Sequence, residues 1–309
     1  MTAVESGRTG AHPESPSERT PRWRAYVALT KPRVIELLLV TTLPVMFLAA
    51  GGFPPVSTMA LTLLGGTMAA AGANVINQVY DRDIDAVMVR TQQRPLVTGS
   101  ISAAHALRFG ILLSVSSVTL LALTVNTLSA LLAAAAIGFY VFIYTMLLKR
   151  RTAQNIVWGG AAGCFPVLIG WSAVTGSLAW APLVLFGIVF FWTPPHYWPL
   201  ALRFKADYQA ARVPMLPAVT DSSSVASAIV GYSWAMVVTS LILTPVAGMT
   251  WLYTGAAVLL GGVFLYEAYA LRSRVRAGAP DSRAMRLFHG SISYLSLLFL
   301  VVAIDPFLR

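Results

Sequence analysis

Nine long apolar stretches occupy most of the 309-residue sequence and restrict it to a helical membrane protein. A helix needs about 20 predominantly apolar residues to cross the hydrocarbon core of a bilayer, and these stretches reach or approach that length. Charged residues make up 11% of the chain, against about 25% in soluble domains. We therefore predict an all-α, polytopic membrane protein with nine transmembrane helices. The predicted spans lie at about 34–52, 57–80, 104–125, 128–148, 154–174, 179–202, 224–247, 251–271 and 286–306.

The basic residues lie almost entirely on one side of these spans. Of the 22 Lys and Arg residues, all except Arg309 fall in the N-terminal arm or in alternate connections between spans. The positive-inside rule then places the N-terminus in the cytoplasm and the C-terminus outside the plasma (inner) membrane. An odd number of spans satisfies this arrangement, whereas eight or ten would return the C-terminus to the basic side.

The net charge of +10 has the same origin and does not predict nucleic-acid binding. Basic cytoplasmic loops suit the anionic headgroups of the lipid bilayer and anionic substrates. Cys164 is the only cysteine, so there is no disulfide framework. Residues 1–25 are polar and lack the apolar core of a signal peptide, so we predict a disordered cytoplasmic tail there. Residues 26–309 then form one transmembrane domain.

The polar segment at the end of the second stretch is the first candidate site. Asn77, Asp81 and Asp85 are spaced i, i+4 and i+8, so on a helix they share one face with a drift of about 40° per step. An Asp in hydrocarbon costs roughly 2.5–3.5 kcal/mol, so a cluster there is a functional-site hypothesis. Such oxygens suit Mg²⁺, which is typically held by one or two carboxylates and substrate phosphates. Arg90 and Arg94 add charge for phosphate. The segment predicts a magnesium–diphosphate site at a membrane surface.

Two other interpretations of this segment are weaker. The alternating acids in 81–85 resemble the start of an EF-hand loop, but that loop needs Gly and Glu where this chain has Ala86 and Gln92. Alternatively, the helix end is solvated and its acids only offset nearby arginines. This accounts for Asp83, which lies on the opposite face. It does not account for Asn74 and Asn77, which both precede the aspartates toward the apolar interior.

Three further basic residues lie at helix ends on the same cytoplasmic side. Lys31 precedes Pro32 at the start of the first span, where it is either an interfacial anchor or a phosphate contact. Lys149 and Arg150 begin a second polar cluster, between the fourth and fifth spans. Its other members are Tyr144, Thr152, Gln154 and Asn155.

The sixth stretch ends in the unusual run 193–199, T-P-P-H-Y-W-P. Proline disrupts a helix interior, and broken helices at membrane depth are tolerated where they line a cavity or are buried in protein. His196 within this run is either a hydrogen-bonded structural residue or, given its aromatic neighbours, a residue that faces a flat and bulky ligand. Asp207 follows in a basic loop.

On these motifs the chain resembles the UbiA superfamily of intramembrane prenyltransferases, from about Lys31 to the C-terminus. The N-x-x-x-D-x-x-x-D pattern that begins at Asn77 marks the superfamily. Three other runs resemble its haem-farnesylating branch, the haem O synthases: Tyr144–Ile156, Thr193–Trp198 and Val213–Pro217.

The resemblance implies a bundle of nine spans around a central cavity that opens toward the cytoplasm. It implies transfer of a farnesyl group from farnesyl diphosphate to a vinyl group of haem B, which yields haem O. Asp81 and Asp85 would hold Mg²⁺, Asn77 would assist them, and His196 would lie near the haem. A haem-pathway membrane partner would be compatible with this role. The candidates for neutralising the diphosphate are Lys31, Arg90, Arg94, Lys149 and Arg150.

The chain departs from the superfamily pattern between the sixth and seventh spans. Members usually carry a second Asp-rich motif there, and the haem branch tends to show K-D-D-Y. This chain has Lys205-Ala206-Asp207-Tyr208, with Ala211 four residues after Asp207. A second, independent Mg²⁺ is therefore not expected. Asp207 remains a catalytic candidate, either by orienting Lys205 or Arg212 or by sharing one metal.

Three alternative functions stay open at this point. The first is a UbiA-type prenyltransferase that acts on an aromatic quinone precursor, which the T-P-P-H run disfavours by resemblance. The second is a carrier or channel, which would need acids at mid-depth and on both sides of the membrane. The third is a non-catalytic haem-binding membrane protein that uses His196 and His289. A requirement for Asp81 would separate the enzyme from this last function.

Overall fold

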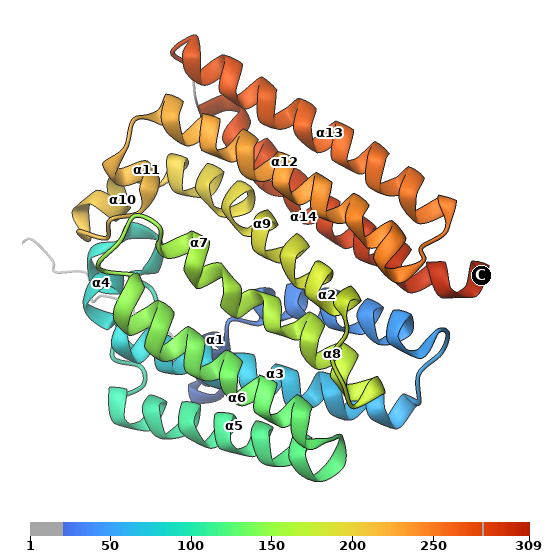
Figure 1. Ribbon diagram of the computed structural model, residues 1–309. Coiled ribbons are helices and arrows are strands. Elements are labelled where there is room, and N and C mark those ends of the chain that lie inside the picture. Colours follow the sequence, from blue (N-terminus) through green and yellow to red (C-terminus); the bar gives the residue numbers. More distant parts are fainter. Residues whose placement is uncertain (1–20, 280) are drawn as a thin grey trace, which may run out of the picture.

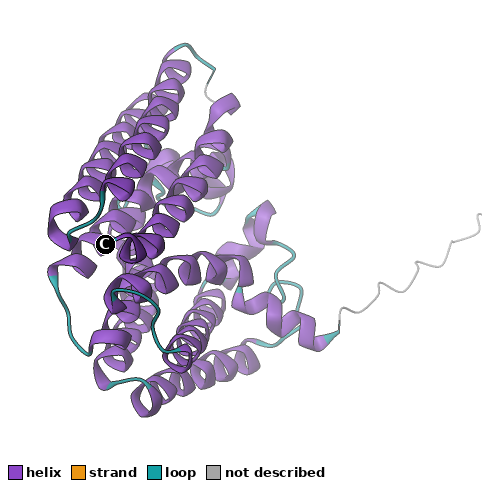
Figure 2. Ribbon diagram, turned by 90° about the vertical axis from the view of Figure 1, so that its right-hand side faces the viewer, coloured by secondary structure: helices purple, strands orange, loops and turns teal. Residues whose placement is uncertain are grey.

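The computed structural model of the protein describes residues 21–279 and 281–309. The first helix, α1 (Arg22–Thr30), begins within the last residues of the predicted tail, and the rest of that tail lies outside the described residues. All regular structure in the described residues is helical, with the helices joined by loops (Figure 2). The all-α prediction is confirmed.

The bundle consists of long helical segments that run side by side (Figure 1). The ends of these segments lie within a few residues of the predicted spans, except at the C-terminal end of α13 and the N-terminal end of α14. In chain order they are α2 (Pro32–Ala50), α3 (Val56–Tyr80), α5 (Ala103–Thr124), α6 (Thr127–Gly138) continued by the π-helix η2 (Phe139–Leu148), α7 (Asn155–Gly159) continued through η3 (Gly160–Cys164) into α8 (Phe165–Thr175), α9 (Trp180–Arg203), α12 (Ser222–Ala247), α13 (Trp251–Arg276) and α14 (Asp281–Ile304).

Eight of these segments in the described part of the chain are long and apolar enough to cross a membrane. The remaining one, α9, is 24 residues long, but its second half carries Thr, Pro, His and Trp side chains that lower its hydropathy. It packs against α12 and α14 inside the bundle. The chain is therefore a polytopic helical protein, and the count of nine spans remains a prediction.

Two groups of helices meet at α2. On one side α3 packs against α5, α5 against α6, and α6 against α8, which returns to α2. On the other side α14 packs against α2 and α9, and α12 packs against α9 and α13. Small residues allow the closest approaches: a Cβ atom at Gly110 of α5 would lie 2.9 Å from the Ile76 side chain of α3.

The prolines of α9 do not interrupt the helix, although the sequence predicts that they distort it. Pro194, Pro195 and Pro199 all lie inside α9, which is continuous from Trp180 to Arg203. Each proline removes one main-chain donor, and the three side chains are buried among neighbouring helices. Packing against α12 and α14 thus supports a helix that the local sequence disfavours.

The short connecting helices gather at one end of the bundle. Figure 1 places α4 (Arg82–Val87), α10 (Lys205–Ala210) and α11 (Leu216–Val219) together at the end opposite the C-terminus. The predicted site residues between 77 and 94 lie in and around α4, so this end contains the candidate active site.

Candidate active site

The face formed by Asn77, Asp81 and Asp85 persists across a break in the helix. α3 ends at Tyr80 and α4 begins at Arg82, with Asp81 between them. The break is bridged by main-chain hydrogen bonds of 2.9 Å from Asp81 to Asn77 and from Asp85 to Asp81. The three side chains are consequently all buried, at 2%, 0% and 3% exposure.

Asp81 is the centre of a buried ionic network. One carboxylate oxygen, Oδ2, forms an ion pair with Lys149 and accepts a hydrogen bond of 2.7 Å from the Asn77 amide. The other, Oδ1, lies 3.8 Å from the Arg150 guanidinium. That oxygen is buried and has no hydrogen-bond partner among the residues that the structure describes. A buried acceptor without a donor is costly, so Oδ1 is a ready ligand atom for a cation.

Two arginines hold the other aspartates. Arg94 pairs with the buried Asp85 at 2.6 Å. Arg150 forms two hydrogen bonds, of 2.7 and 2.8 Å, with the exposed Asp83. These bonds lower the pKa of Asp83 to about 2. Asp83 therefore fits the alternative interpretation of a solvated helix end whose acid offsets a nearby arginine. Asp81 and Asp85, which are buried on the inner face, do not fit it.

Lys31 reaches this network from the junction of α1 and α2. Its backbone is left-handed, with φ 56°, and its Nζ donates to Asn77 Oδ1 at 2.9 Å. Burial is the main cause that lowers the pKa of Lys31 to about 7, and the nearby charges of Arg94 and Lys149 lower it further. A proton on Lys31 is therefore poorly stabilised until an anion arrives.

The position of Lys31 is set by two polar side chains of α3. Gln78 donates to the Leu29 carbonyl at 2.6 Å, and Asn74 donates to the Thr30 carbonyl at 3.2 Å. Both carbonyls lie at the C-terminus of α1, where a helix leaves acceptors unsatisfied. α3 thus caps α1 and fixes the turn from which Lys31 projects. We call the residues brought together here the ionic cluster: Lys31, Asn77, Asp81, Asp85, Arg94, Lys149 and Arg150.

Arg90 and Asp207 are not part of the ionic cluster and contact each other. The main-chain N–H of Arg90, in the 3-10 helix η1 (Val89–Thr91), donates to Asp207 Oδ2 of α10 at 3.4 Å. The Arg90 guanidinium donates to the Tyr208 hydroxyl at 3.4 Å and lies over the Phe204 ring. Within residues 21–279 and 281–309 no three or more His, Cys, Asp or Glu side chains converge as a metal-binding group. In this structure Asp207 connects α10 with η1.

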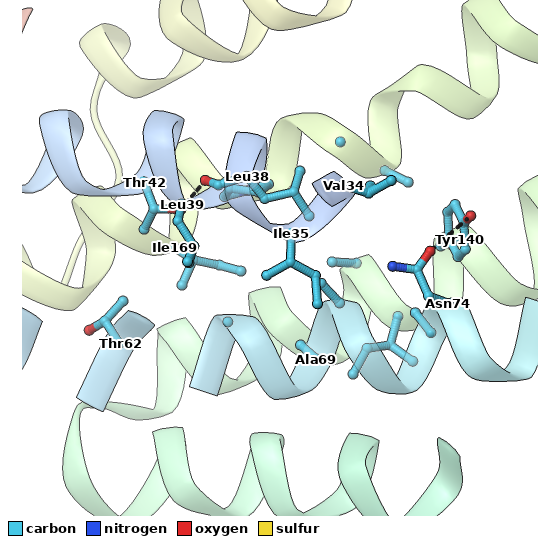
Figure 3. A pocket seen from close by; sticks show the side chains of 18 residues that line it. Val34, Ile35, Leu38, Leu39, Thr42, Thr62, Ala69, Asn74, Tyr140 and Ile169 are labelled. Carbon is cyan, nitrogen blue, oxygen red and sulfur yellow. Dashed lines mark hydrogen bonds between the residues drawn. The ribbon is translucent and has the colours of Figure 1, made fainter. Parts of the chain in front are cut away.

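An apolar cavity of about 140 Å³ begins at Asn74, three residues before Asn77 of the ionic cluster on α3. It lies between α2, α3, α6 with η2, and η3 with α8. Asn74 and Tyr140 line one end, where the Tyr140 hydroxyl donates to Asn74 at 3.4 Å, and Thr62 lies at the far end (Figure 3). The stretch of α3 from Asn74 to Thr62 spans about 18 Å. The wall between them is formed by apolar side chains, among them Val34, Ile35, Leu38, Leu39, Ala69 and Ile169.

His196 lies away from the ionic cluster, between α9 and α14. Its ring stacks between Trp192, at 4.1 Å, and Phe288, at 4.7 Å. Its Nδ1 is hydrogen-bonded to the Ser291 hydroxyl at 2.7 Å. Since Nδ1 is engaged, Nε2 is the ring nitrogen left for a ligand.

Sequence reasoning missed four polar residues of this region as site residues: Asn74, Gln78, Tyr140 and Thr145. For Asn74 and Gln78 a signal existed, since two amides four residues apart in an apolar helix are unusual. For Thr145 there was none, because a single Thr in an apolar run is compatible with any buried position.

Comparison with known proteins agrees with this geometry. The chain matches the UbiA prenyltransferase family over residues 38–292. It is 56% identical to the protoheme IX farnesyltransferase of Streptomyces coelicolor over 100% of both chains, and 58% identical to that of Streptomyces avermitilis over 93% of this chain and 95% of the relative.

Solved structures show the same fold at low sequence identity. A UbiA homolog from Archaeoglobus fulgidus bound to DMAPP and Mg²⁺ has a TM-score of 0.67 and 19% identity, covering 91% of this chain and 99% of its own. A structure described for digeranylgeranylglyceryl phosphate synthase has a TM-score of 0.76 and 15% identity, covering 93% of this chain and 99% of its own. The chain belongs to the UbiA prenyltransferase family.

Proposed function

We propose that this chain transfers a farnesyl group from farnesyl diphosphate to a vinyl group of protohaem IX (haem B), which yields haem O. The observation that carries the proposal is the ionic cluster next to an apolar cavity, whose nearer end is lined by Asn74, three residues before Asn77 on α3. A prenyl diphosphate has the matching form, with a highly charged head and a long apolar chain. The relatives that are more than half identical over the whole chain bear the name of this activity.

The charges of the ionic cluster suit a diphosphate with a divalent cation. Four basic side chains, those of Lys31, Arg94, Lys149 and Arg150, surround two buried aspartates. Asp81 and Asp85 are the residues that would hold Mg²⁺, and the unpaired Asp81 Oδ1 is the atom that best fits it. Bound Mg²⁺ acts as a Lewis acid on the diphosphate oxygens.

The basic side chains of the cluster stabilise the leaving group. When the bond between the farnesyl carbon and the diphosphate oxygen breaks, negative charge develops on the diphosphate. Lys31, Lys149 and Arg150 are held in place by their present partners, so they form a preorganised field for that charge. Asn77 is in contact with both Lys31 and Asp81 and holds the two together.

The apolar cavity holds the farnesyl chain and excludes water. An allylic cation reacts readily with water, so it must form in a dry environment. Apart from Tyr140 at the end nearer the ionic cluster, the residues that line the cavity carry no ionisable group, and the axial length of about 18 Å accommodates a chain of three isoprene units. The chain therefore extends away from the ionic cluster into the bundle.

The acceptor side is assigned to α9 and α14. His196 offers Nε2 to the haem, and Trp192 and Phe288 hold its ring in a fixed orientation by stacking. Asp207 acts by fixing η1, the short helix that carries Arg90. Arg90 stays a diphosphate candidate, although its guanidinium contacts Tyr208 and Phe204 in this structure. A haem-pathway membrane partner would deliver the acceptor or receive the product.

We place the protein in the plasma (inner) membrane with nine spans and the ionic cluster on the cytoplasmic side. The N-terminus is then cytoplasmic, the C-terminus lies outside, and residues 26–309 form one domain after a tail of residues 1–25. The concentration of basic residues at the end of the bundle that carries α4 and α10 supports this orientation.

The test is conversion of haem B by the purified protein with farnesyl diphosphate and Mg²⁺, followed by mass spectrometry of the hydroxyethylfarnesyl haem. Asp81→Ala should abolish the product. Asp221→Ser is the matched control, because it removes an exposed carboxylate but keeps a helix-capping side chain. Prenylation of an aromatic acid but not of haem would refute the acceptor. An Asp81→Ala variant with full activity would refute the metal site.

A further inference from the structure

Thr145 is a fully buried residue of η2 that contacts the ionic cluster and has no part in the transfer described above. Its hydroxyl oxygen accepts a hydrogen bond of 3.1 Å from the Asn77 amide nitrogen. The same hydroxyl donates its proton to the Tyr140 main-chain carbonyl at 2.8 Å. A hydroxyl has one proton, so Thr145 can only be an acceptor toward Asn77.

The π-helical geometry of η2 is what gives Thr145 this role. In an α-helix a Thr hydroxyl bonds to the carbonyl three or four residues earlier, whereas here it reaches Tyr140, five residues earlier. The main-chain bond from Lys149 to Tyr144, at 2.9 Å, has the same five-residue spacing. Such wide turns are rare and frequently occur at functional sites.

The contacts of Asn77 leave only one orientation for its amide. The amide nitrogen donates to Asp81 Oδ2 at 2.7 Å and to Thr145, and the amide oxygen accepts from Lys31 at 2.9 Å. A flipped amide would place its oxygen against the carboxylate and the Thr145 lone pair, and its NH₂ group against the Lys31 ammonium. All three contacts would become unfavourable.

Of the two acceptors, Thr145 is the one that stays constant during the reaction. Asp81 is the proposed metal-binding carboxylate, so its oxygens are shared with whatever binds there. Thr145 is neutral, and its proton is committed within its own helix. The bond from Asn77 to Thr145 therefore keeps the amide oriented when Asp81 is engaged elsewhere.

We propose that Thr145 is a positioning residue that fixes the amide orientation of Asn77, so that the Asn77 oxygen keeps accepting from Lys31 and holds that ammonium in place for the diphosphate. The inference rests on the proposed function, because it concerns binding of the same diphosphate. It requires the hydroxyl group of Thr145 and not merely its volume.

The test compares Thr145→Val, which keeps the shape and removes the hydroxyl, with Thr145→Ser, which keeps the hydroxyl. The matched control is Thr239→Val in α12, whose hydroxyl also donates to a carbonyl of its own helix, at 2.7 Å. The assay is calorimetric binding of farnesyl thiolodiphosphate, an analogue that ionises poorly, in the presence of Mg²⁺. We expect Thr145→Val to bind about 5- to 10-fold more weakly, with Thr145→Ser and Thr239→Val near wild type.

A double-mutant cycle with Asn77→Ala shows whether Thr145 acts through Asn77. If it does, Thr145→Val causes no further loss of analogue binding in the Asn77→Ala background. Thermal unfolding of each variant is measured in parallel, because a purely structural role would lower stability without this coupling.

Three outcomes would overturn the inference: unchanged binding by Thr145→Val, equal losses in the Val and Ser variants, or an undiminished loss in the Asn77→Ala background. Wild type that binds the analogue but makes no farnesylated haem would overturn only the acceptor. Wild type that binds no analogue would overturn the diphosphate site and this inference together.

Discussion

Replacement of Lys31 by Arg isolates the titration of one cation in the ionic cluster. Burial, with Arg94 and Lys149 nearby, lowers the pKa of Lys31 to about 7. Arg stays protonated at every pH used for enzyme work. A bound diphosphate places negative charge at the Lys31 ammonium and raises its pKa again, so binding above about pH 7 takes up a proton in the wild type but not in Lys31→Arg.

The size of the effect follows from this linkage. Well above pH 7 each further pH unit weakens wild-type binding about tenfold relative to the Arg variant. Because Lys31 is already half deprotonated at about pH 7, the ratio of the two Kd values changes by about 50-fold between pH 7 and pH 9. In the absence of ligand, the folding stability of the wild type changes with pH in the opposite direction to its ligand affinity. An unfolded Lys keeps its ordinary pKa near 10.4, so the unfolded state binds more protons between about pH 7 and 10, and stability rises with pH there.

The assay is calorimetric binding of the farnesyl thiolodiphosphate analogue with Mg²⁺ at half-unit steps from pH 6 to 9, for both proteins in the same detergent. The ratio of Kd values cancels the titration of the diphosphate itself, because both proteins bind the same ligand. Parallel profiles for wild type and Lys31→Arg would refute the reasoning, since they would mean that Lys31 does not change its charge in this range.

Three other perturbations test separate parts of the structure. Ala69→Phe narrows the cavity, so kcat/KM for farnesyl diphosphate should fall at least about tenfold relative to that for geranyl diphosphate; an equal fall for both would place the chain elsewhere. Asp305→Ala removes a buried carboxylate that binds Thr250 and Arg309, so denaturation should show about 2–4 kcal/mol less stability with KM unchanged. Removal of Mg²⁺ by EDTA should stop haem O formation and its return should restore it, whereas turnover in EDTA would exclude a metal requirement.

The spans and the acidic face could be predicted because both depend on local periodicity. Hydropathy alone marked α2 and α3, and the spacing of Asn77, Asp81 and Asp85 predicted a shared face. The predicted span 57–80 ends where α3 ends, but the break between α3 and α4 within the acidic face was not predicted. The bridging hydrogen bonds preserve the spacing across this break. The periodic signal therefore described the face correctly although it missed the break.

The partners within the site could not be predicted, because they are distant in sequence. Thr145 is 68 residues from Asn77, Lys149 is 68 residues from Asp81, and Lys31 is 46 residues from Asn77. The charges of Lys31 and Lys149 indicated that they were candidate diphosphate-binding residues, but not which side chains they would contact. Arg90 shows the limit of this approach: its charge suggested a diphosphate contact, and the fold places it against α10.

The distribution of the site along the chain has a consequence for biosynthesis. Every residue of the ionic cluster lies between Lys31 and Arg150, whereas His196 and its stacking partner Phe288 come from α9 and α14. During translation the proposed donor half is thus complete in sequence before the proposed acceptor half emerges. With this assignment, we expect substitutions in α9 and α14 to change the acceptor while the charged end of the bundle is left intact.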